Sequence, residues 1–275
     1  MDLTSKQNIQ LLLKKRGVQP QKRFGQNFLI NKELSQKLVA TAEIDVKDTV
    51  LEIGPGIGAI TRTLAQKAKR VVAIEKDREM IEILKETLKN FENVKIIQGD
   101  ILKVPFPELQ LPTPYQVVGN LPFYLTAPVV RRFLEMSEAG PQSLTLVVQK
   151  EVGQRICAKS PHMSILANSV QFYADPEIIS VISKKSFFPQ PKVDAALIKI
   201  TPRPEPMGDS KKFFEAVKAG FSHPRKQILN NLAQGLKKNR EDVLALLQKN
   251  NINPQQRAET LNVEDWINLT KSFVL

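Results

Sequence analysis

The sequence LEIGPGIGAITRTLA has glycines at positions 54, 56 and 58, a residue type and spacing suited to holding a cofactor. Glycine lets the chain turn tightly and lets a ligand approach the backbone N–H groups at the start of a helix. The pattern Gly54-x-Gly56-x-x-Ala59 also fits the dinucleotide fingerprint in its G/A form. The loop therefore predicts a cofactor site at Gly54 and Gly56, and it leaves open both a nicotinamide cofactor and S-adenosylmethionine.

Two carboxylates follow this loop at the ends of predicted strands. Glu75 ends RVVAIE, 17 residues after Gly58, close to the spacing of about 20 at which an acid binds ribose hydroxyls in dinucleotide sites. Asp100, in Gly99-Asp100, follows the next apolar run, where its carboxylate could accept a hydrogen bond from an adenine amino group. Because both candidate cofactors carry an adenosine ribose, Glu75 does not separate them.

The tetrapeptide Asn120-Leu121-Pro122-Phe123 ends a fourth apolar run and neither continues a strand nor starts a helix well. We expect the Asn120 side-chain oxygen and a backbone carbonyl at Leu121 or Pro122 to accept both N–H groups of an exocyclic adenine amine. Held in this way, the nitrogen becomes more tetrahedral and can attack a sulfonium methyl group. Phe123 would stack on the base, which must leave its helix or come from an unpaired loop. This chemistry needs neither a metal nor a strong general base.

Placing these residues together requires a sheet whose strands end at one edge. Five short apolar runs alternate with helical patterns at 57–68, 78–89 and 126–136, an order that predicts a doubly wound α/β fold. The runs are TVLEI (49–53), RVVAIE (70–75), NVKIIQ (93–98), YQVVG (115–119) and SLTLVV (143–148). Open α/β sheets bind ligands beyond the carboxyl ends of their strands. The glycine loop, both acids and Asn120 all fall there.

The last part of the sheet follows another pattern. EIISVIS (177–183) and AALIKIT (195–201) are separated by a Phe-Pro-rich loop with no room for a crossover helix. We therefore predict that these two strands form an antiparallel pair. PRPEP (202–206) breaks the pattern, and four short helical segments follow it.

Three regions follow from this pattern. Residues 4–13 favour a short helix, and Gly17, Pro20 and Gly25 favour an extended basic arm after it. The expected regions are the N-terminal arm with its lead-in helix (1–48), a Rossmann-like domain (49–202) and a small all-α domain (203–275).

Composition limits the class of protein. One cysteine and two histidines argue against a disulfide framework and against a metal centre. No run reaches the roughly 18 apolar residues of a membrane span, so we expect a cytoplasmic protein with no membrane partner. Of the net charge of +12, residues 1–40 carry +6 and residues 203–275 carry +4. Basic ends predict a polyanionic partner, although such ends can also be merely solvated.

A series of motifs runs in order through most of the chain. The segments are RFGQNFL (23–29), LEIGPGIGAIT (51–61), Glu75, GD (99–100), NLPF (120–123), FFPQPKVDAAL (187–197) and RKQILNNL (225–232). Together they resemble the KsgA family of small-subunit ribosomal RNA adenine dimethyltransferases, relatives of the Erm-type resistance methyltransferases. The resemblance implies a class I methyltransferase fold with a helical C-terminal domain. It also implies the use of S-adenosylmethionine to dimethylate N6 of two neighbouring adenines in a terminal hairpin loop of small-subunit rRNA.

The resemblance also implies a role for individual residues. Asn27 and Leu29 of the arm would close over the cofactor. Gly54 would contact the amino-acid end of the cofactor, Glu75 its ribose and Asp100 its adenine. Asn120 would hold the target amine, and Phe187 would offer the target base a second ring opposite Phe123. Phosphate contacts would come from Lys14, Lys15, Arg16, Lys22, Arg23, Arg225 and Lys226. Two departures stand out. The family usually has tyrosine where this chain has Phe123. Where the family usually has an Arg-rich run, this chain has His223-Pro224-Arg225-Lys226.

Three alternatives remain open. A ribosome-assembly factor that lost its chemistry would not need the amine acceptors of Asn120 to Phe123. A large-subunit rRNA methyltransferase of the Erm type shares the mechanism, although the FGQNFL arm and the NNL helix favour the small subunit. The third alternative is a NAD oxidoreductase, for which lack of nicotinamide binding would be decisive. Under the first hypothesis, the partner is rRNA within a precursor small subunit, and we expect a monomer.

Overall fold

The computed structural model describes residues 1–136 and 140–272, without the side chains of Lys22 and Phe123. The chain forms two compact units. Unit 1 contains Met1–Gly153 and Glu177–Pro202, and unit 2 contains Gln154–Pro176 and the chain from Arg203 onward. Sequence analysis places residues 154–176 in the larger domain, whereas in the structure they belong to the helical unit.

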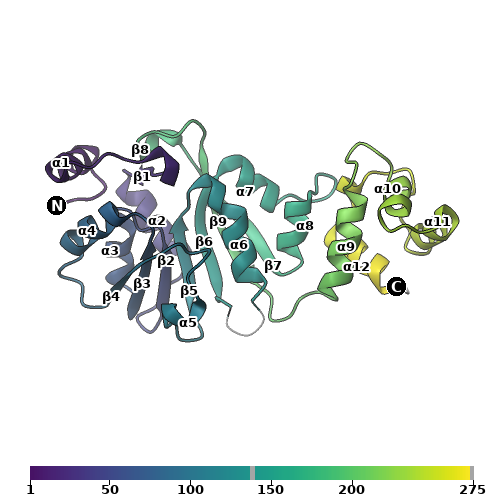
Figure 1. The fold of residues 1–275 in the computed structure, drawn as a ribbon, viewed down its shortest axis with the longest axis horizontal. Coiled ribbons are helices and arrows are strands. Elements are labelled where there is room, and N and C mark those ends of the chain that lie inside the picture. Colours follow the sequence, from purple (N-terminus) through teal and green to yellow (C-terminus); the bar gives the residue numbers. More distant parts are fainter. Residues whose placement is uncertain (137–139, 273–275) are drawn as a thin grey trace. The chain divides into compact units, whose positions relative to one another are not determined.

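Unit 1 is built on a mostly parallel sheet. Its strands are β2 (Thr49–Ile53), β3 (Arg70–Glu75), β4 (Val94–Gln98), β5 (Gln116–Asn120), β6 (Ser143–Gln149), β7 (Ala174–Ile182, which begins in unit 2) and β9 (Ala195–Pro202). Among the described residues they follow the order β4-β3-β2-β5-β6-β9-β7 (Figure 1). The pairs from β4 to β6 are parallel, and β9 runs antiparallel to β6. The five predicted parallel strands are confirmed to within one residue at each end.

Helices connect the parallel strands and cover the sheet. They are α2 (Lys32–Thr41), α3 (Ala59–Ala65), α4 (Arg78–Thr87), α5 (Phe106–Leu109), α6 (Thr126–Leu134) and α7 (Lys150–Ile156), which continues into unit 2. Every residue of β2 is buried, as expected of a strand covered on both faces. Asp77 begins α4 because its side chain accepts the Glu79 N–H. The helix predicted from residue 57 begins at Ala59, since Gly58 before it has φ +89°.

The N-terminal arm is more ordered than expected. It contains α1 (Lys6–Arg16), a 3-10 turn η1 (Lys22–Phe24) and β1 (Phe28–Leu29). The helix runs on to Arg16 and ends at Gly17, which adopts the left-handed conformation with φ +67°. The basic residues 14–16 therefore end a helix, which corrects the expected extended arm. β1 pairs antiparallel with β8 (Phe187–Phe188).

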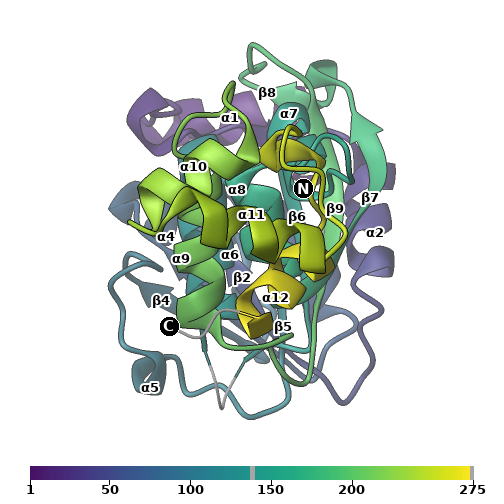
Figure 2. The ribbon, with the colours of Figure 1, turned by 90° about the vertical axis from the view of Figure 1, so that its right-hand side faces the viewer.

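Unit 2 is helical. It holds α8 (Ile165–Gln171), α9 (Ser210–Gly220), α10 (Ile228–Gly235), α11 (Arg240–Lys249), the 3-10 turn η4 (Ala258–Thr260) and α12 (Val263–Ser272). α9 contacts α10 and α12, and α10 contacts α11 (Figure 2). Phe172, which follows α8, stacks on Phe213 of α9 with ring centroids 4.2 Å apart, and Trp266 is fully buried in the same core. This packing explains why residues 154–176 join the helical unit.

Candidate functional site

A cavity opens at the carboxyl ends of β2 and β5. Ile53 of β2 pairs with Gly119 of β5, so Gly54 and Asn120 leave the sheet side by side. The strand order changes direction between these two strands, and open α/β sheets bind ligands at such a point. The cavity measures about 590 Å³ when the open solvent at its mouth is counted. Its lining comprises residues 24–29 of the arm, 54–57, 59 and 60 of the glycine loop, Glu75, Asn120 and Pro122.

The glycine loop forms the floor of this cavity. Gly54 and Gly56 have φ angles of +70° and +56°, which favour glycine over other residues. A Cβ atom on Gly56 would lie 3.1 Å from the Phe28 ring of the arm, so a side chain there would push the arm away. Gly119 is constrained as well, because its Cβ would lie 3.0 Å from the Ile53 carbonyl oxygen. Gly54 and Gly56 thus keep backbone atoms at the cavity surface.

Glu75 lies at the cavity wall with both carboxylate oxygens held by the backbone. Oε2 accepts the Gly56 N–H at 3.1 Å, and Oε1 accepts the N–H groups of Lys76 and Asp77 at 2.8 and 2.9 Å. Burial raises the pKa of Glu75 above its ordinary value, and these three hydrogen bonds oppose the rise. The side chain therefore has a fixed direction beside the glycine loop.

Asp100 lies at the same sheet edge but is not part of the cavity lining. Its Oδ2 pairs with Lys76 Nζ at 3.0 Å, and its Oδ1 accepts the Leu102 N–H at 3.0 Å. Burial raises the pKa of this carboxyl, but the hydrogen bonds from Leu102 and Lys76 outweigh that effect and hold the pKa below its ordinary value. Asp100 is thus an ionised acceptor next to the cavity.

Asn120 is oriented by the arm. Its Nδ2 donates to the backbone carbonyl of Asn27 at 2.9 Å. The Asn27 side chain in turn donates to the Gly25 carbonyl at 3.0 Å. Asn27 and Leu29 both line the cavity, and Leu29 pairs with Phe187 in the β1–β8 ladder. The two arm residues singled out from the sequence therefore both lie at the cavity wall.

The segment after Asn120 turns sharply. Leu121 is buried and donates its N–H to the Val147 carbonyl at 3.1 Å, which extends the β5–β6 pairing. The Pro122 carbonyl accepts the Leu125 N–H at 2.9 Å within the 3-10 turn η2 (Phe123–Leu125). Of the two expected backbone acceptors, Pro122 is already engaged, so Leu121 is the better candidate. The Phe123 side chain, expected to stack on a base, lies outside the described part.

Phe187 occupies a different place from the one expected. Its ring is buried in a cluster with Leu29, Leu38 and Val118, and it is not among the cavity-lining residues. The antiparallel pairing with Leu29 directs it into this core. A stacking role for Phe187 is therefore not supported by this arrangement.

Comparison with known proteins shows the family to which the chain belongs. The family described as Ribosomal RNA adenine dimethylase matches residues 17–274. The chain belongs to this family. The Ribosomal RNA small subunit methyltransferase A of Dehalococcoides mccartyi (strain CBDB1) is 41% identical over 256 residues, covering 92% of this chain and 88% of that protein. The protein of the same name from Bacillus mycoides (strain KBAB4) is 36% identical over 287 residues, covering 100% and 98%.

Solved structures agree with this assignment. The crystal structure of 23S rRNA methyltransferase ErmE matches with a TM-score of 0.74 at 27% identity, covering 89% of this chain and 98% of that chain. The methyltransferase fold, the family and the enzyme class inferred from the sequence are confirmed. Family membership disfavours the NAD oxidoreductase.

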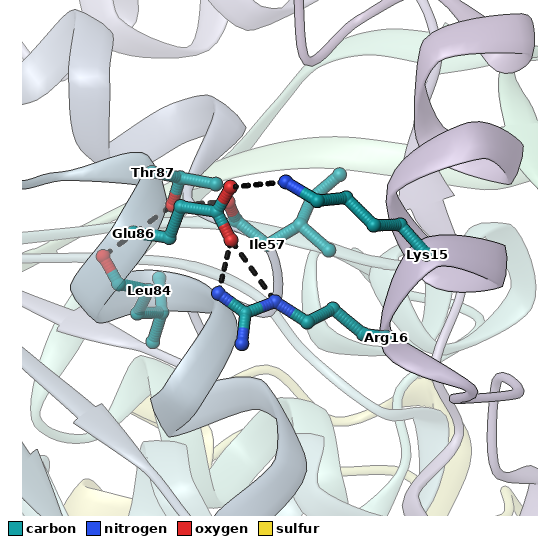
Figure 3. A network of polar contacts seen from close by, with 6 residues as sticks. All are labelled: Lys15, Arg16, Ile57, Leu84, Glu86 and Thr87. Atoms are coloured by element: carbon teal, nitrogen blue, oxygen red, sulfur yellow. Dashed lines mark hydrogen bonds and ion pairs between the residues drawn. The ribbon is translucent and has the colours of Figure 1, made fainter.

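The basic residues expected to bind RNA divide into two groups in this dimethylase family member. Lys15 and Arg16 both pair with Glu86 of α4, the Lys15 pair at 3.3 Å (Figure 3). Figure 3 shows both side chains reaching from α1 to the same carboxylate. Lys14 lies beside them in the last turn of α1 and is exposed. Two of the expected phosphate contacts therefore also hold the arm against the methyltransferase unit.

Other expected RNA contacts are more open. Arg23 is exposed, donates to the Gln21 side chain at 2.7 Å and lies over the Phe24 ring. Arg225 and Lys226 are exposed in the loop before α10, which starts at Ile228. Both cations therefore precede the helix and do not lie on it. The Lys22 side chain lies outside the described part.

Sequence reasoning missed one contact in this site. Gln26 lines the cavity and donates to Asp77 at 2.7 Å. Gln26 belongs to the RFGQNFL motif, but no spacing rule links it to Asp77, 51 residues away. Within the described residues no group of three or more His, Cys, Asp or Glu could hold a metal ion. In the same part of the chain, no helix has the length and apolar character of a membrane span.

Proposed function

We propose that this protein transfers methyl groups from S-adenosylmethionine to N6 of two adjacent adenines in a 3′-terminal hairpin loop of small-subunit rRNA, giving N6,N6-dimethyladenosine. The observation that carries the proposal is the Asn120 amide at the cavity wall. Its NH2 group is committed to the arm, so its oxygen is available to accept an amine N–H. This is the acceptor that an adenine amine needs.

The residues around the cavity fit the proposed cofactor. Gly54 and Gly56 bring backbone atoms to the cavity without side chains, which suits close contact with an amino-acid group. Oε2 of Glu75 holds one backbone N–H and can also accept a ribose hydroxyl. Asp100 of the same sheet edge would accept from the adenine amino group, and Asn27 and Leu29, which line the cavity, would close over the cofactor.

The chemistry requires positioning more than proton transfer. S-adenosylmethionine, when bound, supplies an electrophilic sulfonium methyl group. The oxygen of Asn120 and the carbonyl of Leu121 would accept the two N–H groups of the target amine and direct its lone pair toward the cavity. Once the nitrogen has been methylated it is acidic enough to lose its proton to solvent. Phe123 would hold the base by stacking, as the sequence predicts.

The small subunit is favoured over the large subunit as the substrate. The two relatives named for the small subunit are 41% and 36% identical to this chain, whereas the 23S rRNA methyltransferase ErmE is 27% identical. Arg23, Arg225 and Lys226 are exposed cations that can position the RNA through its phosphates. We further propose that the substrate is a precursor small subunit in the cytoplasm and that the protein acts as a monomer.

Transfer of labelled methyl groups tests this function. The full chain is incubated with radiolabelled S-adenosylmethionine and small ribosomal subunits that lack the modification, with large subunits in parallel, and labelled nucleosides are identified after digestion. We expect N6,N6-dimethyladenosine from small subunits alone. Label in large subunits would favour the Erm-type substrate. Cofactor binding without any label would favour a non-catalytic assembly factor.

A further inference from the structure

The direction of the Asn120 amide needs an explanation. An asparagine amide presents an oxygen on one side and an NH2 group on the other, and only the oxygen accepts an amine N–H. Turned by 180°, the amide would set its NH2 donor against the donors of the target amine. In the structure, Nδ2 donates to the Asn27 carbonyl at 2.9 Å. Because a carbonyl only accepts, this contact selects the orientation that leaves Oδ1 for the substrate.

The selecting carbonyl belongs to the arm and not to the sheet. On one side of Asn27, the Gly25 turn, with φ +61°, packs on Pro122, because a Cβ atom on Gly25 would lie 2.9 Å from the Pro122 Cβ. On the other side, Phe28 pairs with Phe188 in the β1–β8 ladder. These two contacts, of Gly25 with Pro122 and of Phe28 with Phe188, define the docked position of the arm. Whatever fixes this position also fixes the Asn120 amide.

Gln26 fastens this part of the arm to α4. Its Oε1 accepts the Gln21 N–H at 2.8 Å, and its Nε2 donates to Asp77 Oδ2 at 2.7 Å. The Gln21 side chain makes a longer contact of 3.5 Å with the same oxygen. Asp77 is 4% exposed, caps α4 through the Glu79 N–H, and donates its own N–H to Glu75. The Gln26–Asp77 bond therefore joins the arm to the buried acid that begins α4.

We propose that Gln26 is a positioning residue for methyl transfer. Through its hydrogen bond to Asp77 it holds the arm so that the Asn27 carbonyl fixes the Asn120 amide with its oxygen toward the target amine. The inference rests on the proposed function, because Asn120 acts there as the amine acceptor. It implies that the catalytic site is complete only while the arm is docked.

A swap of the two partners tests this role. Gln26→Glu sets two carboxylates against each other. Asp77→Asn keeps one oxygen to cap α4 but sets an NH2 group against the NH2 group of Gln26. The double variant Gln26→Glu/Asp77→Asn restores a hydrogen bond of reversed polarity and the original net charge. In that variant the new glutamate can still accept the Gln21 N–H, and the new asparagine oxygen can still cap α4. Gln10→Glu, at an exposed position of α1, controls for the added charge.

Turnover is measured at saturating cofactor and RNA, with thermal unfolding to confirm that each variant is folded. We expect each single variant to show a kcat about tenfold or more below that of the wild type, the double variant to return to within about threefold of it, and Gln10→Glu to match it. Two results would overturn the inference: single variants with wild-type kcat, or a double variant no better than the worse single variant.

Hydrogen exchange of backbone amides at 18–30 reports on the arm without any turnover. Both single variants should exchange faster there, and the double variant should recover its protection. Unchanged exchange in both single variants would show that Gln26 does not hold the arm, and the inference would fail. Absence of methyl transfer by the wild-type protein would instead refute the proposed function, and the exchange result would still decide whether the tether exists.

Discussion

At the scale of single residues, the side chains of the site work by holding fixed directions. Glu75 is held by three backbone N–H groups, and the Asn120 amide is turned by the Asn27 carbonyl. Such groups cost little reorganisation during a reaction, which makes their contribution to rate large. Removing the Asn120 amide, which faces the reacting amine, should therefore affect turnover more than cofactor binding.

Asn120→Ala tests this expectation. The variant lacks the acceptor for the target amine, so kcat should fall by about ten- to a thousandfold, the range for one oriented polar group. Affinity for S-adenosylmethionine, measured by calorimetry, should change little. If affinity and kcat fell equally, Asn120 would mainly shape the cofactor cavity that it lines.

Glu52 is a second buried acid, beneath the glycine loop. It is 1% exposed, and burial raises its pKa from 4.5 to about 8, with the Thr61 hydroxyl opposing part of the rise and Glu75 adding to it. Oε2 of Glu52 and the Thr61 hydroxyl have no partner at hydrogen-bonding geometry within the described residues. We therefore regard Thr61 as a weak stabiliser of the charged form, and expect Glu52 to be protonated at neutral pH.

This shift makes stability depend on pH. Between pH 4.5 and about 8 the unfolded chain has released the Glu52 proton while the native chain keeps it, so the free energy of unfolding falls as the pH rises. Glu52→Gln removes this effect. Urea unfolding from pH 5 to pH 8 should therefore show a shallower decline for the variant, the difference reaching a few kcal/mol, on the order of 1.4 per pH unit. Parallel curves for both proteins would mean that Glu52 ionises normally.

At the scale of elements, the arm is the part that completes the site. At the end of α1, Lys15 and Arg16 form ion pairs with Glu86 of α4. Further along the arm, Gln26 donates a hydrogen bond to Asp77 at the beginning of the same helix. Exposed ion pairs contribute little individually and weaken in salt. The β1–β8 ladder and the Gln26–Asp77 hydrogen bond add to these pairs in holding the arm.

Glu86→Lys tests the contact between α1 and α4. The new lysine would face Lys15 and Arg16, so amide exchange in α1 should become several-fold faster, and affinity for S-adenosylmethionine should fall because the arm covers the cavity. High salt should weaken the wild-type contact in the same direction. Glu92→Lys is the matched control, since Glu92 is exposed in the turn after α4. Equal exchange in Glu86→Lys and Glu92→Lys would argue against a specific contact.

At the scale of the whole molecule, the cations behind the net charge of +12 differ in their surroundings. Lys15 and Arg16 are paired with an acid, while Arg225 and Lys226 of the helical unit are exposed. Exposed cations neutralise phosphates and release counterions, so RNA binding should weaken as salt rises.

Arg225→Ala/Lys226→Ala tests the contribution of the helical unit. Removing one cation that neutralises a phosphate should reduce the slope of log K against log salt by about one, so the slope of the double variant should be smaller by about two. At saturating RNA its kcat should stay near that of the wild type. Lys67→Ala/Lys69→Ala removes the same charge before β3, at the sheet edge opposite Glu75. Equal slopes for both double variants would show that only net charge matters.

The sequence alone determined the parallel strands, the glycine loop, Glu75 and Asn120 at one edge of the sheet. These features depend on local patterns, because apolar runs define strands and parallel strands end at a common edge. Motif order also indicated the family, which the match over residues 17–274 confirms.

Only the tertiary structure decided how the arm and the site meet. Gln26 and Asp77 are 51 residues apart, Asn27 and Asn120 are 93 apart, and Arg16 and Glu86 are 70 apart. The sequence marks Lys15, Arg16 and Phe187 as ligand contacts, but folding pairs the two cations with Glu86 and buries the ring in the core. A local pattern predicts which element a residue belongs to and what chemistry its side chain can do. The partner that the side chain contacts far along the chain depends on how the elements pack in the folded unit.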